Sequence, residues 1–228
     1  MKVTCFLPCR AGSERVKNKN TRQFAGVDGG LLKIKLDQLI RCPLIETIVL
    51  STDDKKVIEV SKPYGKRVRI DNRPPELATS ETSTDELIRY VPEIISDTHI
   101  LWTHVTSPFA GEEVYTKAIN EYFRAIKTGN YDSLMSVTPF RVHVWDRNGK
   151  PVNYSREELR WPRSQQVEPL FEVNSAVFIN SRENYRKLED RIGARPFLFE
   201  MERTDALDID YEDDFMLAES IFRFRGLR

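Results

Sequence analysis

Apolar runs of strand length alternate with amphipathic segments of helical period along most of the 228-residue chain. The runs predict strands at 2–8, 47–50, 67–70, 100–105, 133–137, 173–179 and 197–201. The segments between them predict helices at 31–41, 55–64, 85–95, 112–127, 182–189 and 211–224. Strands that alternate with helices in this way form βαβ units, so we predict an α/β fold with a mostly parallel, doubly wound sheet.

The alternation is interrupted between residues 139 and 172. Two short apolar stretches, His143–Trp145 and Val152–Tyr154, flank Asn148-Gly149, a dipeptide that favours a tight hairpin turn. We therefore predict a β-hairpin within an insertion at about 139–172 that projects from the sheet. Because 228 residues is only slightly more than the ~100–200 of a typical domain, we expect 1–228 to be a single domain that carries this insertion.

The composition argues against several classes of protein. Lys and Arg number 35 and Asp and Glu also number 35, so the basic surplus typical of nucleic-acid-binding proteins is absent. Mean hydropathy is −0.48, and no apolar run approaches the ~18 residues that span a bilayer. The first residues lack the apolar core and cleavage site of a signal peptide. We expect a cytoplasmic protein with neither nucleic acid nor membrane as a partner.

The loop after the first strand, residues 10–20, is named here the cationic turn. Open α/β sheets bind ligands where their strands end, and Ala11-Gly12-Ser13 can expose backbone N–H groups there. Four side chains add positive charge suited to phosphate: Arg10, Arg15, Lys17 and Lys19. The two common nucleotide-loop patterns, G-x-x-x-x-G-K-[ST] and G-x-G-x-x-G, are absent. From charge alone, a solvated basic loop is an equal alternative.

Asp208 and Asp210, named here the acidic pair, are separated by one residue near the end of the chain. In an extended segment both side chains point to the same side, and paired carboxylates together with substrate phosphates are typical ligands of Mg²⁺. The alternative is an acidic start to the last helix, favoured by the helix dipole, and Asp213 and Asp214 fit that alternative better.

His104 is the one histidine expected at a strand end, where it is followed by Thr106 and Ser107. A lone histidine is more often structural than catalytic. Because no Ser-His-Asp or Cys-His arrangement stands out, the sequence gives no support to a covalent nucleophile.

Taken together, these segments resemble the acylneuraminate cytidylyltransferase family, which comprises CMP–sialic acid synthetases and their relatives. The resemblance spans nearly the whole chain and rests on seven motifs in register: Arg10-Ala11-Gly12-Ser13 with Lys19-Asn20, Ser51-Thr52-Asp53, Arg73-Pro74-Pro75-Glu76-Leu77-Ala78, Thr106-Ser107-Pro108, Pro162-Arg163, Asn174-Ser175-Ala176-Val177-Phe178-Ile179, and Asp208-Ile209-Asp210 through Asp214-Phe215.

The resemblance implies a nucleotide-diphospho-sugar transferase type of sheet, with the insertion forming a homodimer. It implies Mg²⁺-dependent transfer of CMP from CTP to the anomeric hydroxyl of a 2-keto-3-deoxy acid sugar, with release of pyrophosphate. Catalytic roles would fall to Arg10, Lys19 and Asp208, and Mg²⁺ would be held by Asp208 and Asp210. The implied nucleotide-binding residues are Arg10, Gly12, Ser13, Lys19, Asn20, Arg73, Thr82 and Thr84. The implied acceptor-binding residues are His104, Thr106, Ser107, Arg163, Gln165, Gln166 and Asn174, those of the insertion coming from the partner subunit.

Departures from the family pattern concern the acceptor. His104-Val105 replaces the usual Gln-Pro, Ala110 replaces a common Arg, Ser175 replaces a Gly, and Glu172 stands where some members have Arg. The acceptor therefore stays open: a sialic, legionaminic or pseudaminic acid, or alternatively a Kdo-like sugar, a phosphonate or another small molecule. A non-catalytic nucleotide-binding protein is a further alternative, although the intact charges of the cationic turn and the acidic pair argue against it.

Overall fold

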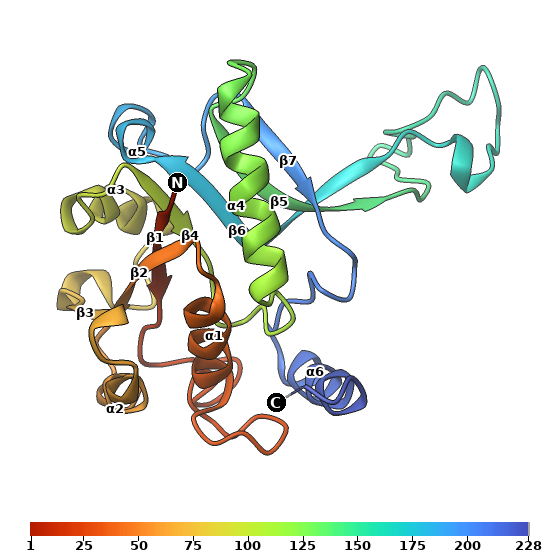
Figure 1. Ribbon diagram of the computed structural model, residues 1–228. Helices are drawn as coiled ribbons and strands as arrows, with labels where there is room; N and C mark the ends of the chain where they lie inside the picture. The colour runs from red at the N-terminus through yellow and green to blue at the C-terminus, as the bar shows by residue number, and fades with distance from the viewer. Residues whose placement is uncertain (228) are drawn as a thin grey trace.

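Seven strands form one sheet in the computed structural model, which describes residues 1–227 (Figure 1). The strands are β1 (Val3–Pro8), β2 (Ile45–Thr52), β3 (Val68–Asn72), β4 (His99–Trp102), β5 (Ser133–Phe140), β6 (Leu170–Ser181) and β7 (Pro196–Glu200). Their spatial order is β3-β2-β1-β4-β6-β5-β7. Only β6 runs antiparallel to its two neighbours, so the predicted mostly parallel sheet is confirmed.

Helices cover both faces of the sheet, as the doubly wound prediction requires. They are α1 (Gly30–Arg41), α2 (Lys55–Ser61), α3 (Thr84–Ile94), α4 (Glu112–Lys127), α5 (Arg182–Leu188) and α6 (Glu212–Phe224). Helices α1, α2, α4 and α6 contribute to the larger hydrophobic core, and α3 and α5 to a smaller core on the other face. Within residues 1–227, no helix has the length and apolar character needed to cross a membrane.

Several predicted elements differ from the structure in extent, and two of them end three residues earlier than predicted. The helix predicted to reach residue 64 ends as α-helix at Ser61 and continues as a 3₁₀ helix, Lys62–Arg67, because Pro63 lies near the first turn of that continuation and cannot donate a backbone hydrogen bond. The strand predicted at 100–105 ends at Trp102. Beyond it the Trp102 indole N–H donates to His104 Nε2 at 3.0 Å, a contact between two side chains close in sequence.

The insertion forms an arm that leaves the body of the molecule beyond the ends of β5 and β6 (Figure 1). The hairpin predicted inside it is present but short: Trp145 and Pro151 form one antiparallel bridge, flanked by backbone hydrogen bonds from Asp146 to Lys150 and from Val152 to Val144, both at 2.8 Å. Side chains add to this pairing: the Asp146 carboxylate accepts from the backbone of Asn148 and Lys150, and Asn153 bonds the backbone at Val142, Val144 and Glu168. An isolated two-stranded hairpin is marginal in water, which explains the additional bonds.

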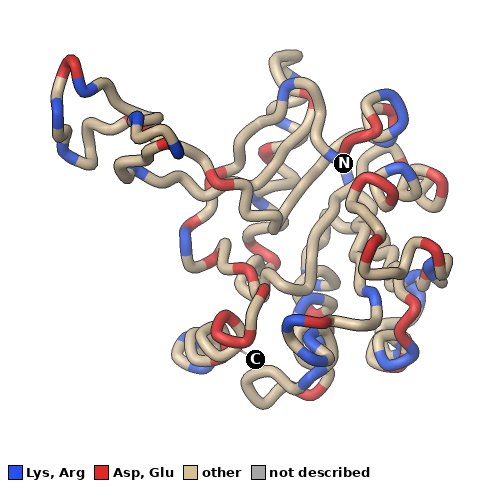
Figure 2. The backbone as a smooth tube through the Cα atoms, turned by 180° about the vertical axis from the view of Figure 1, so that it is seen from behind, with Lys and Arg blue, Asp and Glu red and all other residues tan. Residues whose placement is uncertain are grey.

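Positive and negative side chains are interspersed along the backbone of both the body and the arm (Figure 2). The even mixture follows from the equal numbers of basic and acidic residues. Any region with a surplus of positive or negative side chains is therefore a local feature, because the chain as a whole has no surplus of either.

The loop between β4 and α4 is anchored by a lysine inside the core. Lys35, on α1, is fully buried and donates from Nζ to the Ser107 carbonyl at 2.8 Å, the Ala110 carbonyl at 2.9 Å and the Tyr115 hydroxyl at 2.8 Å. Tyr115 in turn lies 2.8 Å from the Thr103 hydroxyl, at the end of β4. One ammonium group thus joins α1, α4 and the segment that follows β4.

The buried lysine makes stability depend on pH. Burial lowers the pKa of Lys35 to about 7 from the usual 10.5, so between these values the unfolded chain binds the additional proton. The free energy of unfolding of the wild type therefore rises with pH in that window. Relative to Lys35→Met, which lacks this group, we expect the rise to be at most about 1.4 kcal/mol per pH unit.

Chemical denaturation of the wild type and Lys35→Met across this pH range measures the difference. Lys33→Met is the matched control, because Lys33 lies on the same helix but is exposed and paired with Asp37. A wild-type advantage that falls with rising pH, or that Lys33→Met reproduces, would contradict the expectation.

Candidate active site

A cavity of about 430 Å³ opens at the carboxyl end of β1 and β4. Its wall combines the cationic turn with the segment after β4, and it is lined by Pro8, Cys9, Arg10, Ser13, Glu14, Arg15, Val16, Lys19, Asn20, Ser80, His104, Val105 and Thr106. Six of the residues predicted for the site, Arg10, Ser13, Lys19, Asn20, His104 and Thr106, are brought together here. The position agrees with the general rule that open α/β sheets bind ligands at this edge.

Hydrogen bonds to the end of β2 and within the loop fix the shape of the cationic turn. Asp53 accepts from the Ala11 backbone N–H at 2.8 Å, and the Asn20 amide donates to the Arg10 carbonyl at 3.1 Å. Between them, Gly12 has φ +74°, a left-handed conformation that costs glycine little. Asn20 therefore has a visible role as a support of the turn.

The cationic turn and the acidic pair meet directly, although they lie at opposite ends of the sequence. Lys19 Nζ donates to the Ile209 carbonyl at 2.7 Å and lies 3.9 Å from Asp210 Oδ1, and Arg15 pairs with Asp210 at 3.0 Å. Ile209 itself is fully buried in the larger core, which anchors the backbone between the two carboxylates. The predicted convergence of opposite charges is therefore present.

Asp208 and Lys19 occupy environments that disfavour their charged forms. Burial is the main cause that raises the pKa of Asp208, with Asp210 adding to it, while the Thr106 side chain and Lys19 oppose the shift. Burial likewise lowers the pKa of Lys19, against the attraction of Asp210 and Asp208. Groups perturbed in this way cluster at functional sites.

One carboxylate oxygen in the site has no partner. Asp208 Oδ1 is buried and accepts no hydrogen bond from any described residue, an arrangement that costs free energy unless a ligand satisfies it. Within residues 1–227, no three His, Cys, Asp or Glu side chains cluster as a complete metal site. Two carboxylates with an unsatisfied oxygen fit Mg²⁺, which commonly takes its remaining ligands from water and substrate phosphates.

His104 lines the cavity as a neutral imidazole. Burial and the nearby positive charges of Arg191, Lys19, Lys35 and Arg73 lower its pKa to about 3. Because Nε2 accepts from the Trp102 indole, the proton of the neutral ring is assigned to Nδ1. His104 can therefore donate a hydrogen bond to a ligand, but it carries no positive charge near neutral pH.

Seven other predicted residues do not line the cavity. Gly12 lies within the cationic turn, and the acidic pair touches the wall through Arg15 and Lys19. The Arg73 guanidinium is buried against the end of β2, where it donates to the Ser51 carbonyl at 2.8 Å. Ser107 is fully buried and its carbonyl binds Lys35. Thr82 donates to the Glu76 carbonyl, and Thr84 begins α3. The loop that carries Thr82 reaches the cavity through Ser80 instead.

The remaining predicted acceptor residues lie in or near the arm. Arg163, Gln165 and Gln166 are exposed in the arm and are absent from the cavity wall of their own chain. Asn174 is buried, and its side-chain oxygen accepts from the Ser136 hydroxyl at 2.6 Å. This bond joins β5 and β6 at the point where their pairing is irregular. Next to it Ser175 has φ +58°, so a serine occupies a left-handed position that glycine would fill without strain.

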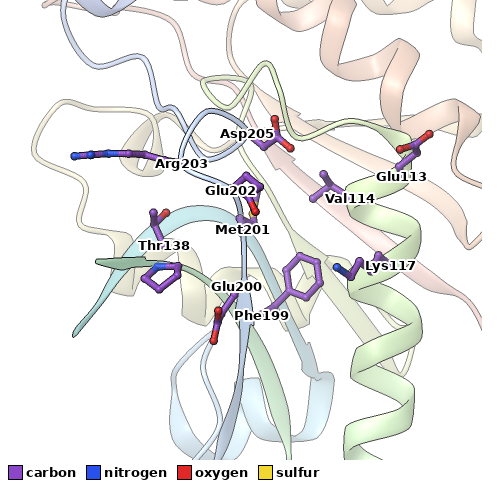
Figure 3. Close-up of a pocket in the computed structure, with 11 residues that line it drawn as sticks. Glu113, Val114, Lys117, Thr138, Phe199, Glu200, Met201, Glu202, Arg203 and Asp205 are labelled. Carbon is purple, nitrogen blue, oxygen red and sulfur yellow. The ribbon is translucent and has the colours of Figure 1, made fainter. Parts of the chain in front are cut away.

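A second cavity of about 380 Å³ lies between α4 and β7 (Figure 3). Its wall includes Glu113, Lys117, Phe199, Glu200 and Arg203. None of the residues predicted for the site lines it, and it shares no residue with the cavity of the cationic turn. The cationic turn lines the first cavity, and the acidic pair contacts Arg15 and Lys19 of its wall, so the first cavity is the candidate site.

Some residues of the wall were not singled out by the sequence. Ser80 lies in a polar loop with no distinctive spacing, and Val16 was not named among the charged and small residues of the cationic turn. Arg15 was noted for its charge alone, and its pairing with Asp210 could have been anticipated only from the meeting of the two segments.

Comparison with known proteins agrees with this geometry. The family described as Cytidylyltransferase matches residues 4–222. The chain belongs to the cytidylyltransferase family. The match includes both the cationic turn and the acidic pair, so the two halves of the candidate site fall inside the family domain.

Individual relatives are distant. The N-acylneuraminate cytidylyltransferase of Escherichia coli O18:K1:H7 is 26% identical over 96% of this chain and 52% of its own length, so this chain spans about half of that relative. The CMP-N,N'-diacetyllegionaminic acid synthase of Legionella pneumophila is 26% identical over 97% of this chain and 96% of its own. A solved CMP:2-keto-3-deoxy-manno-octonic acid synthetase complexed with CTP has a TM-score of 0.68 at 14% identity, over 99% of this chain and 100% of its own, which shows the shared fold.

Proposed function

We propose that this protein transfers CMP from CTP to the anomeric hydroxyl of a 2-keto-3-deoxy acid sugar. The hydroxyl oxygen attacks the α-phosphorus, the bond from that phosphorus to the bridging oxygen of the β-phosphate breaks, pyrophosphate leaves, and the hydroxyl proton is released. The observation that carries the proposal is the contact between the cationic turn and the acidic pair, Lys19 to Ile209 at 2.7 Å and Arg15 to Asp210 at 3.0 Å.

This reaction needs positioning and charge neutralisation rather than a protein nucleophile. Arg10 and Lys19 supply positive charge on the cavity wall, and Ser13 and the backbone around Gly12 supply uncharged donors. Lys19 is held by its bond to the Ile209 carbonyl, so its charge is fixed in direction before a triphosphate binds. A preorganised cation is more effective at stabilising developing charge than a mobile one.

Asp208 and Asp210 would hold Mg²⁺, which when bound would neutralise part of the triphosphate charge. The buried, unpartnered Oδ1 of Asp208 supports this assignment. Asp210 is about half exposed, which leaves it accessible to a metal ion even though Arg15 and Lys19 now share its charge.

The acceptor in this proposal is a sialic, legionaminic or pseudaminic type of acid, in line with the named relatives. A homodimer is part of the proposal, because the arm exposes large apolar side chains such as Trp161, which is 66% exposed. In such a dimer, Arg163, Gln165 and Gln166 would approach the acceptor from the arm of the second copy.

Pyrophosphate release tests the proposal. Purified protein with Mg²⁺ would be incubated with CTP, GTP or UTP and each of four acids: N-acetylneuraminate, N,N'-diacetyllegionaminate, pseudaminate and 3-deoxy-manno-octulosonate. We expect release from CTP with at least one of the first three acids. Release with 3-deoxy-manno-octulosonate alone would change the acceptor class, and no release with any pair would contradict the proposal.

A further inference from the structure

Arg191, in the segment between α5 and β7, stacks on an aromatic shelf formed by two strand residues. Its guanidinium carbon lies 3.9 Å from the centroid of the Phe178 ring and 5.2 Å from that of Trp102. These residues are direct neighbours in the pairing of β4 with β6. Stacking occupies the flat face of a guanidinium and leaves its N–H groups, which lie in the plane, free to donate.

Arg191 has no acidic partner. No described residue in 1–227 forms an ion pair with it or accepts a hydrogen bond from its side chain, and the neighbouring Asp190 carboxylate accepts from the Ile192 backbone instead. Burial lowers the pKa of Arg191, the sign of a charge that is partly desolvated. The charge of Asp190 opposes this shift without pairing directly with the guanidinium, so a bound ligand group of opposite sign would be favourable there.

A second polar group beside Arg191 also lacks a partner. Tyr185, on α5, is buried with its hydroxyl unsatisfied, and the positive charge of Arg191 acts on its pKa. A buried hydroxyl without a partner is unusual in a well-packed interior. Arg191 beside it is half-buried, and none of its nitrogen atoms is a buried atom without a partner.

Arg191 does not itself line the cavity of the cationic turn, but the aromatic shelf links it to His104, which does. Trp102 donates from its indole to His104 Nε2 at 3.0 Å, and His104 lines that cavity. Among the charges that act on the pKa of His104, Arg191 has the largest effect, followed by Lys19, Lys35 and Arg73. The three others already donate to the Ile209, Ser107 and Ser51 carbonyls. Arg191 is the member of this set with its donors uncommitted.

We propose that Arg191 is a specificity-determining residue, binding the carboxylate of an acidic acceptor at the end of the cavity marked by His104. The assignment rests on the proposed function for the identity of that acceptor. In this assignment, the positive charges of the cationic turn bind the triphosphate, and that of Arg191 binds the carboxylate of the acceptor. Neutral His104, with Nδ1–H as a donor, lines the cavity and is bonded to the aromatic shelf through Trp102.

Equilibrium binding tests the assignment separately from turnover. Calorimetric titration would compare the wild type, Arg191→Met and Arg191→Lys with the same four acids, with the carboxamide of each acid, and with CTP. Because a charge-assisted, two-pronged pair is lost, Arg191→Met is expected to bind the acid about 10- to 100-fold more weakly, and Arg191→Lys to lose less. Binding of the carboxamides and of CTP is expected to be unchanged.

The matched control is Arg186→Met, which removes an exposed arginine of α5 that is paired with Glu93. It is expected to bind the acids as the wild type does. If Arg191→Met does not fold, the comparison of acid with carboxamide on the wild type and Arg191→Lys still measures the effect.

Three results of the binding experiment would overturn the assignment: equal binding of the acids to the wild type and Arg191→Met, equal weakening for the carboxamides or CTP, or no binding of any acid to the wild type at millimolar concentration. An acid that binds through Arg191 without release of pyrophosphate would remove the proposed function and leave the assignment standing. Release of pyrophosphate with an unchanged KM for the acid in Arg191→Met would remove the assignment alone.

Discussion

Lys19→Ala is expected to lower the rate of pyrophosphate release from CTP by about 100- to 1,000-fold, the usual cost of removing one fixed donor to developing negative charge. Lys19 Nζ bonds the Ile209 carbonyl and is mostly buried, with 14% of its side chain exposed, so its position varies little. The rate constant for release under saturating CTP, Mg²⁺ and acceptor measures the effect.

The control for this prediction is Lys17→Ala. Lys17 belongs to the same turn, but it is exposed and does not line the cavity, so its removal is expected to leave turnover unchanged. Thermal unfolding of both variants separates a loss of charge from a loss of structure, since Lys19 also ties the cationic turn to the segment before α6. Near wild-type turnover in Lys19→Ala would remove Lys19 from the phosphate site.

The meeting of the cationic turn and the acidic pair could be predicted from the sequence for a physical reason. Both segments follow predicted strands, and strands of a mostly parallel sheet end at one edge, so charges far apart in the chain are brought to the same place. The structure adds one feature that the prediction did not use: Ile209, between the two carboxylates, is buried in the core and fixes the backbone there.

The positions of Lys35 and Arg191 could not be predicted. Lys35 occupies a core-facing position of α1, where a helical pattern predicts an apolar side chain, and only its three buried acceptors explain its presence. Arg191 lies outside every motif, and its stacking depends on Trp102 and Phe178 being paired across two strands. Both cases depend on tertiary contacts that no local pattern encodes.

The hairpin predicted in the arm is present but short for a related reason. Asn148-Gly149 forms the turn, but a turn fixes only local geometry. How far a ladder continues from it depends on a third strand or a packed face, and here it stops after one bridge, with the side chains of Asp146 and Asn153 adding hydrogen bonds to the backbone.

Asp208→Asn is expected to lower turnover by about 100-fold or more at a fixed Mg²⁺ concentration, comparable to the loss of a principal electrostatic contact. The change keeps the shape of the side chain while removing its negative charge, and an amide is a weaker ligand for a hard cation than a carboxylate. The unpartnered Oδ1 of Asp208 is the atom expected to lose its ligand. Titration of turnover with Mg²⁺ is expected to show a raised half-saturating concentration.

Two further variants distinguish the loss of a metal ligand from the loss of a negative charge in this titration. Asp210→Asn is expected to raise the Mg²⁺ requirement as well, because it removes the other carboxylate of the acidic pair, which now lies 3.0 Å from Arg15. Asp213→Asn, an exposed residue in the first turn of α6, is the matched control and is expected to leave the titration unchanged. Since all three changes remove one negative charge from the same end of the chain, a general electrostatic effect would move them together. A Mg²⁺ titration that is the same for Asp208→Asn and Asp213→Asn would therefore exclude Asp208 as a metal ligand.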